Sequence, residues 1–272
     1  MAMKDITLGQ YFPGNTVIHR LDPRTKLLFT VIYIVALFLA SHLVTYGILA
    51  AVLLGCILVS KIKFRALRKG LKPVLIIVLI TGILNLLYTP GAEGELPLAS
   101  FWIFSIYPAG IWAASFMVVR IVLLIICTFL LTYTTSPILI TDALETLLGP
   151  LKKIHLPIHE LAMMMSIALR FIPTLIEETD KIMSAQRARG ADFDSGGLIK
   201  KAKALIPLLV PLFISAFRRA DELAVAMECR CYHGGTGRTR MRQLKFAARD
   251  YVALVASLLL CVGVGILGHY GF

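Results

Sequence analysis

The sequence contains no signature of nucleotide hydrolysis or of the common hydrolytic enzymes. Gly-Lys never occurs as a dipeptide, so the phosphate-binding pattern G-x-x-x-x-G-K-[ST] cannot be met. The patterns G-x-S-x-G and H-E-x-x-H are also absent. We therefore expect a protein that is not an enzyme, has no catalytic residues and binds no cofactor of its own.

Cysteine is also scarce. The chain has five cysteines, and three of them lie within apolar runs. The other two, Cys229 and Cys231, have no second cysteine pair that would complete a zinc site. The sequence therefore predicts no metal centre, and its cysteines fit a reducing compartment.

Acidic residues are few: 16 Asp and Glu stand against 28 Lys and Arg, in a chain that is 58% hydrophobic with a mean hydropathy of +0.80. This composition is too apolar for an ordinary soluble domain. Strong hydrophobicity with a basic balance predicts an all-α integral membrane protein with positively charged cytosolic segments, and not a nucleic-acid-binding protein. The lipid bilayer is thus the first expected partner.

The first apolar run covers residues 27–60, between basic flanks. Basic flanks on both sides indicate an even number of crossings, so we predict a hairpin of two helices, about 16 residues each, that turns near Ser41-His42. Asp22, just before this run, either lies in a solvated segment or caps a helix that begins at Pro23.

Three further spans are predicted at 73–88, 111–134 and 250–270. Arg120 lies within the second of these. An arginine inside a membrane is either a functional residue or a structural one that hydrogen-bonds or reaches for the interface. With Asn85 it is the starting point for any polar site within the spans. Small residues in the last span favour close helix packing. They are Gly263, Gly265 and Gly268.

The distribution of Lys and Arg predicts the orientation. Residues 1–26 carry four, 61–72 six, 89–110 none and 135–249 seventeen. Positive charge marks cytosolic segments, so 61–72 is a predicted cytosolic loop and 89–110 an outside loop. Five spans then place the N-terminus in the cytosol and the C-terminus outside. The predicted organisation is a membrane domain at 1–134, a cytosolic coupling domain at 135–249 with long helices ending near 190 and 232, and a last span at 250–272.

Two helical segments in the polar region end in the same pattern. An aspartate, an alanine and an arginine recur with identical spacing, as Asp180, Ala185 and Arg189 and as Asp221, Ala226 and Arg230. Each segment is predicted to start after a proline, Pro173 or Pro211, and each ends near glycine. Either the arginines only cap the negative ends of their helices, or they are paired contacts for a partner. Two matched segments favour the partner.

Four motifs resemble the transmembrane T component of energy-coupling factor (ECF) transporters, and the resemblance covers nearly the whole chain. They are 19–27, which includes Asp22-Pro23-Arg24; 131–137 followed by Leu144-Glu145; 159–173; and Gln186-Arg187-Ala188-Arg189-Gly190. In that family two Ala-Arg-Gly motifs end two long coupling helices, which dock on a pair of ABC-type ATPases. The first motif is intact at Ala188-Arg189-Gly190, with Arg187, Asp180 and Asp221 as supporting residues. The second reads Cys229-Arg230-Cys231, which keeps the arginine and replaces both small residues.

The resemblance implies a subunit that passes ATP-driven motion from two cytosolic ATPases, which bind the ATP, to a membrane substrate-binding S component for vitamin or micronutrient uptake. One alternative is the cobalt- or nickel-type relative with a dedicated substrate subunit. Another is a stand-alone permease or a membrane enzyme, which would need a polar site within the spans.

Overall fold

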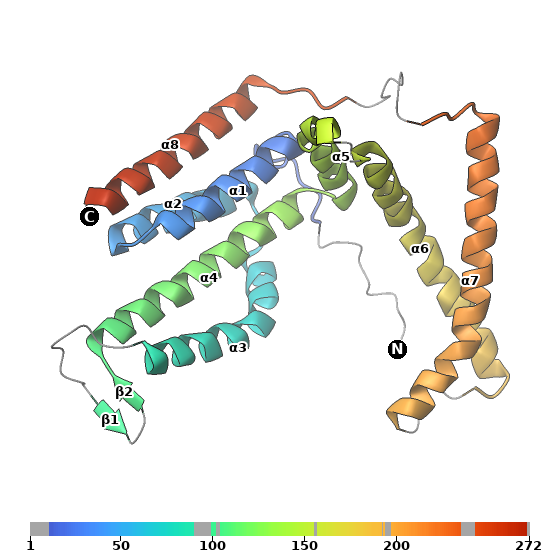
Figure 1. Cartoon of the computed structure of the whole chain (residues 1–272), viewed down its shortest axis with the longest axis horizontal. Helices are drawn as coiled ribbons and strands as arrows, with labels where there is room; N and C mark the ends of the chain where they lie inside the picture. Colours follow the sequence, from blue (N-terminus) through green and yellow to red (C-terminus); the bar gives the residue numbers. More distant parts are fainter. Residues whose placement is uncertain are drawn as a thin grey trace. The chain divides into compact units, whose positions relative to one another are not determined.

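The computed structural model describes residues 11–89, 99–101, 104–154, 157–191, 193, 197–234 and 243–270, and these are almost entirely helical (Figure 1). The all-α membrane fold is therefore confirmed. The chain divides into two compact units. The membrane unit comprises Gly9–Ala143 with Leu244–Phe272, and the second, which we call the α6–α7 unit, comprises Leu144–Gln243.

The membrane unit begins with the predicted hairpin. Helices α1 (Pro23–Leu39) and α2 (Leu43–Ser60) are separated by a break at 40–42, so the turn at Ser41-His42 is confirmed. The first helix starts earlier than the apolar run because the Asp22 side chain accepts the Arg24 N–H at 2.9 Å and Pro23 occupies its first turn. Of the two alternatives for Asp22, the structure shows the helix cap.

Helix α3 (Phe64–Tyr88) corrects the predicted loop at 61–72. Most of that basic stretch is helical, and only 61–63 connect α2 to α3. Lysine and arginine are good helix formers, so positive charge marks a side of the membrane without predicting a loop. Pro73 lies inside the helix. It does not start the helix, as the predicted span at 73–88 required.

The predicted outside loop at 89–110 lies partly outside the described residues. Its described part contains strands β1 (Ala99–Phe101) and β2 (Phe104–Ile106), which pair antiparallel. The sequence analysis missed this short hairpin. Helix α4 (Pro108–Thr134) follows it and matches the predicted fourth span, beginning three residues earlier.

The core of the membrane unit is built where α1 packs against α4 and α8 (Ala248–Tyr270), and where α2 and α3 pack against α4. Tyr33 and Tyr133 are almost completely buried there. The Tyr33 hydroxyl donates to the Leu49 carbonyl at 2.9 Å, which ties α1 to α2. Close packing by glycine is confirmed at Gly268, where a Cβ would lie 3.1 Å from the Leu39 carbonyl oxygen. The same expectation was wrong for Gly263, which faces open space.

Arg120 has a structural role in this core. Its Nε donates to the Tyr46 hydroxyl at 2.9 Å, and its Nη2 donates to the Ala40 carbonyl at 3.2 Å. Ala40 is the C-cap of α1, so the guanidinium lies at the negative end of that helix. Arg120 therefore joins α4 to the turn between α1 and α2.

Five helices in the described part of the chain are long and apolar enough to cross a membrane: α2, α3, α4, α6 and α8. The number agrees with the predicted five, but the set differs. Helix α1 has only 17 residues, about 25 Å in length, against a hydrocarbon core of about 30 Å. Helix α6, which we assigned to the coupling domain, meets the criterion as the least apolar of the five.

The α6–α7 unit is reached through α5 (Pro137–Leu147), which crosses the boundary between the units, and the 3-10 helix η2 (Gly149–Ile154). Helices α6 (Ile158–Ala188) and α7 (Leu198–Cys229) pack against each other and cross (Figure 1). The prediction that the helical segments start after Pro173 and Pro211 was wrong, since both prolines lie inside their helices. Each proline removes one intrahelical hydrogen bond, yet the long helix continues through it.

Candidate functional site

Helix α6 ends in a Schellman motif. Arg189 is the C-cap residue, and Gly190 follows with a φ of 86°. The Gly190 N–H donates to the Arg187 carbonyl at 2.9 Å, and the Ala191 N–H donates to the Gln186 carbonyl at 3.0 Å. Glycine suits this position because it adopts positive φ without steric cost. The last helical carbonyls are therefore satisfied, and Arg189 stands at the helix end.

Helix α7 ends in the same way. Arg230 is the C-cap, and Cys231 takes the left-handed position with a φ of 56°. The Cys231 N–H donates to the Glu228 carbonyl at 2.8 Å, and the Tyr232 N–H donates to the Met227 carbonyl at 3.0 Å. The two ends thus share the same pair of closing hydrogen bonds, although Cys231 bears the strain of about 1–2 kcal/mol that Gly190 avoids.

We call these two segments, Ala188-Arg189-Gly190 and Cys229-Arg230-Cys231, the arginine ends. All six residues are exposed. Among the residues that the structure describes, neither Arg189 nor Arg230 has a hydrogen bond or an ion pair through its side chain. A cation at the C-terminal end of a helix is stabilised by the helix dipole, and its donors remain available. The geometry therefore suits a partner that offers carboxylate or carbonyl oxygens.

The supporting residues predicted for the arginine ends do not contact them in the described structure. Asp180 is partly buried and Asp221 is exposed, and each lies nine residues, about 13 Å, before its arginine. No hydrogen bond or ion pair between described residues joins these carboxylates to Arg189 or Arg230. Arg187 is exposed and has an interaction of its own. In the described part of the chain, neither Arg189 nor Arg230 is therefore bonded to the aspartate that precedes it.

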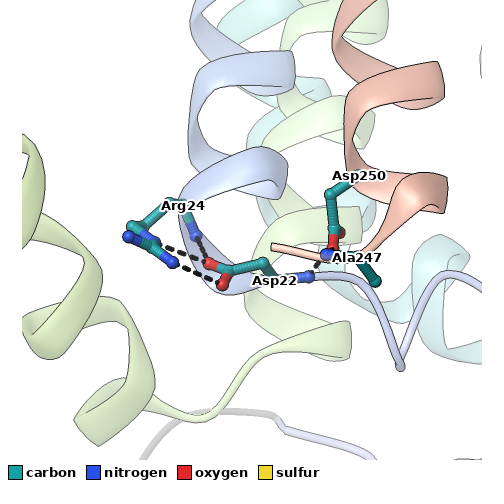
Figure 2. Close-up of polar contacts among 4 residues, drawn as sticks. All are labelled: Asp22, Arg24, Ala247 and Asp250. Carbon is teal, nitrogen blue, oxygen red and sulfur yellow. Dashed lines mark hydrogen bonds and ion pairs between the residues drawn. The ribbon is translucent and has the colours of Figure 1, made fainter. Parts of the chain in front are cut away.

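The N-terminal motif Asp22-Pro23-Arg24 forms a separate contact in the membrane unit (Figure 2). The Asp22 carboxylate accepts from Arg24 Nε at 3.1 Å and from Arg24 Nη2 at 2.9 Å. The Asp22 N–H in turn donates to Asp250 Oδ1 at 2.8 Å, and the Ala247 N–H donates to Asp250 Oδ2 at 2.8 Å. The start of α1 is thereby fixed to the start of α8.

Sequence reasoning missed the partners of this motif. Asp250 is 1% exposed and sits in the first turn of α8, where a carboxylate that reaches back to the N-cap N–H stabilises the helix start. Phe246 lies under Arg24, with the guanidinium carbon 4.0 Å from the ring centroid. The detectable signal was Asp250 itself, the acidic residue that directly precedes the last apolar run.

Comparison with known proteins identifies the family. A family model described as "Cobalt transport protein" matches residues 14–241. A protein of Clostridium kluyveri, named "Energy-coupling factor transporter transmembrane protein EcfT", is 57% identical over 263 residues, which are 96% of this chain and 97% of the relative. Proteins of the same name from Thermosediminibacter oceani and Bacillus subtilis are 51% and 50% identical, over 96% and 95% of this chain and 97% and 96% of their own. The chain belongs to the energy-coupling factor transporter transmembrane proteins.

Membership of the ECF transmembrane family confirms the resemblance drawn from the four sequence motifs. The chain is a multi-pass membrane protein and the transmembrane component of a transporter that has other subunits. Its relatives are named as transmembrane transport proteins, which agrees with a subunit that is not itself an enzyme.

Proposed function

We propose that this chain is the coupling subunit of an ECF-type importer, in which Arg189 and Arg230 dock on two cytosolic ABC-type ATPases. The observation that carries the proposal is the matched termination of α6 and α7, each with an exposed arginine at its C-cap. Two equivalent ends on one chain fit a pair of equivalent acceptors. The planar guanidinium is suited to this contact because it donates several hydrogen bonds to carboxylate and carbonyl oxygens at once.

In the proposed mechanism ATP binding closes the ATPase pair, and the two helix ends move with it. This chain itself binds no cofactor, because the ATP is held by its partners. Helices α6 and α7 form a platform for a membrane S component, which carries the vitamin or other micronutrient. The uncovered apolar side chains along α7, such as Phe213 at 62% and Phe217 at 68% exposure, support such a platform.

Co-purification with a co-expressed pair of cognate ATPases tests the docking. We expect stable capture by the native chain and loss of capture by the double variant Arg189→Glu/Arg230→Glu. Loss of a buried charged contact costs about 2–5 kcal/mol at an interface, a factor of roughly 30 or more in affinity. Lys203→Glu, an exposed charge reversal elsewhere on α7, is the matched control and should leave capture unchanged. Equal capture by the native chain and the double variant would contradict the proposal.

The proposed orientation places the N-terminus and the arginine ends in the cytosol and the C-terminus outside, with α6 in the cytosolic domain. A cysteine appended to either terminus, in a chain whose own cysteines are replaced, tests this orientation in intact cells. We expect a membrane-impermeant maleimide to label the C-terminal cysteine and not the N-terminal one. If α6 also crossed the bilayer, the number of crossings would be even and the C-terminal cysteine would stay unlabelled.

A second candidate is a cobalt- or nickel-type ECF importer, which the description of the matching family model favours. Uptake assays with cells that express the whole transporter separate the two. Accumulation of radioactive cobalt or nickel that depends on this chain would support the metal-ion importer. A more distant alternative, a stand-alone permease or membrane enzyme, is disfavoured by Arg120, whose donors bind Tyr46 and Ala40.

A further inference from the structure

An ion pair joins α6 to α7. Arg219 Nη2 donates to Glu178 Oε2 at 3.1 Å. The guanidinium carbon of Arg219 also lies 5.7 Å from the ring centroid of Phe171, on the same helix as Glu178. Both charged side chains are only partly exposed, 24% for Glu178 and 28% for Arg219. Because the pair is partly shielded from water, it contributes more to stability than a fully exposed ion pair would.

The two partners of this ion pair occupy equivalent positions in the repeated pattern. They are 41 residues apart, which is also the separation of Asp180 from Asp221 and of Arg189 from Arg230. Residues at equivalent positions meet each other only on a twofold axis. The crossing of α6 and α7 thus lies on a local pseudo-twofold axis that relates the two arginine ends.

The segments from the ion pair to the arginine ends, which we call the arms, are equally long in the two helices. Arg189 follows Glu178 by eleven residues and Arg230 follows Arg219 by eleven, so each arm is about 16 Å long. Eleven residues make close to three whole turns, so each arginine lies on nearly the same helix face as its crossing residue. The C-terminal ends of α6 and α7 lie apart from each other in Figure 1. A rotation of about 10° at the crossing moves the end of such an arm by about 3 Å.

Glu178 and Arg219 carry opposite charges, and each follows a residue of its own sign, Glu177 on α6 and Arg218 on α7. Lys181 on α6 also lies close enough to act on Glu178. The ion pair attracts one helix to the other. Exchanging the two charges would preserve the attraction.

We infer that the Glu178–Arg219 ion pair is the pivot of the α6–α7 crossing and sets the separation at which Arg189 and Arg230 are presented. Glu178 and Arg219 are then positioning residues that act through the arginine ends, an inference that rests on the proposed function above. When the pair is intact, the two ends hold one spacing and follow the ATPase pair together. When it is broken, the arms move independently, and ATP hydrolysis is no longer fully converted into transport.

Distances between the arms test the structural half of the inference without any partner. Spin labels are attached at Ser184→Cys and Val225→Cys, which are exposed and equivalent, in the full chain with its five cysteines replaced. We expect one narrow distance distribution in the native background. Glu178→Arg and Arg219→Glu each broaden it or shift it by several ångströms, and the double exchange restores it. The neighbouring reversals Glu177→Arg and Arg218→Glu, at exposed positions, are matched controls and leave it unchanged.

The functional half is measured in the reconstituted transporter as ATP hydrolysed per substrate molecule imported. We expect this ratio to rise about fivefold or more in each single variant, which is the lower end of typical coupling effects, and to return toward the native value in the double exchange. Should a reversal fail to fold, as judged by gel filtration, Glu178→Gln gives the same reading with a neutral side chain.

Three outcomes overturn the inference. Unchanged distances in the single variants would show that the ion pair does not set the crossing. A double exchange that fails to restore the distances would show that its charges are not the cause. Altered distances with an unchanged ratio of ATP to substrate would remove the positioning role. None of these results bears on whether the native chain captures ATPases, so failure of the proposed function remains separately visible.

Discussion

The membrane unit and the α6–α7 unit differ in the partners of their charged side chains and in the burial of their apolar ones. In the membrane unit, buried charges are bound to backbone groups of the same unit: Asp250 accepts two N–H groups, and Lys26 Nζ donates to the His19 and Thr134 carbonyls. In the α6–α7 unit the arginine ends have no such partners among the described residues. These buried charges of the membrane unit are thus satisfied within the unit, whereas the exposed donors of Arg189 and Arg230 remain available.

Apolar residues show the same difference. Every residue of the buried hydrophobic cluster belongs to the membrane unit. Among the described residues of α7 only Leu208 is buried, while Ile206, Val210 and Phe213 are exposed. A long helix with so little buried surface derives little stability from its own chain. Within the described chain, the contacts of α7 are mainly those with α6.

Removing the Asp250 carboxylate tests whether bonded, buried charges stabilise the membrane unit as this comparison states. Asp250→Ala leaves two N–H groups without an acceptor, the buried one of Asp22 and the partly buried one of Ala247, and removes the hydrogen bond from the start of α1 to α8. Hydrogen bonds to a charged group contribute about 1.5–3 kcal/mol each, so we expect a loss of roughly 3 kcal/mol. In detergent the unfolding midpoint should fall by about 6–12 °C.

Asp221→Ala is the matched control in the α6–α7 unit. Its carboxylate is exposed, so the midpoint should change by no more than about 2 °C. Equal effects of the two substitutions would contradict the comparison, because Asp250 would then contribute no more to stability than an exposed aspartate.

Arg120 gives the next largest expected effect. Arg120→Met retains a long unbranched side chain but removes the hydrogen bonds to Tyr46 and to the Ala40 carbonyl. We expect the free energy of unfolding to fall by about 2 kcal/mol. Arg170→Met, at an exposed position on α6, is the control and should be nearly neutral. If Arg120→Met abolished uptake while the unfolding midpoint stayed constant, Arg120 would belong to a substrate path and the membrane unit would not be closed around it.

Because apolar length is a strong signal, the sequence alone predicted four of the five candidate spans, and it missed α6. It predicted where α6 and α7 end because the two helices repeat one pattern. It failed where two signals compete. The basic stretch before Pro73 reads as a loop by charge and by proline, yet residues 64–72 are helical because lysine and arginine favour helix. Pro173 and Pro211 were predicted to start helices because proline is common in the first turn, yet both lie inside long helices.

The contacts between distant segments could not be predicted from the sequence. Asp22 and Asp250 are separated by 228 residues, and only the packing of α1 on α8 brings them together. The Glu178–Arg219 pair is different, because its 41-residue separation repeats the spacing of the arginine ends. An acidic residue and a basic residue at equivalent positions were visible in the sequence. Their meeting depended on where the helices cross, which local pattern does not encode.

The smallest expected effect lies within the α6–α7 unit, where the two arginine ends share one backbone conformation but differ in the residue that adopts positive φ. Gly190→Ala should weaken the end of α6 by about 1 kcal/mol, and Cys231→Gly should strengthen the end of α7 by a similar amount, because a side chain is costly in the left-handed region. Nothing lies within 4 Å of the Cβ position at Gly190, so the effect there reports backbone conformation without a clash.

Hydrogen exchange at the N–H groups of residues 189–191 and 230–232 measures both changes, since these groups close the last turns of the two helices. Exchange should become about fivefold faster at the α6 end in Gly190→Ala and about fivefold slower at the α7 end in Cys231→Gly. Cys229→Ala, two residues earlier and helical, is the control and should leave exchange at 230–232 nearly unchanged. Faster exchange in Cys231→Gly would mean that the cysteine side chain itself stabilises the α7 end. The two arginine ends would then differ by more than the strain at one residue.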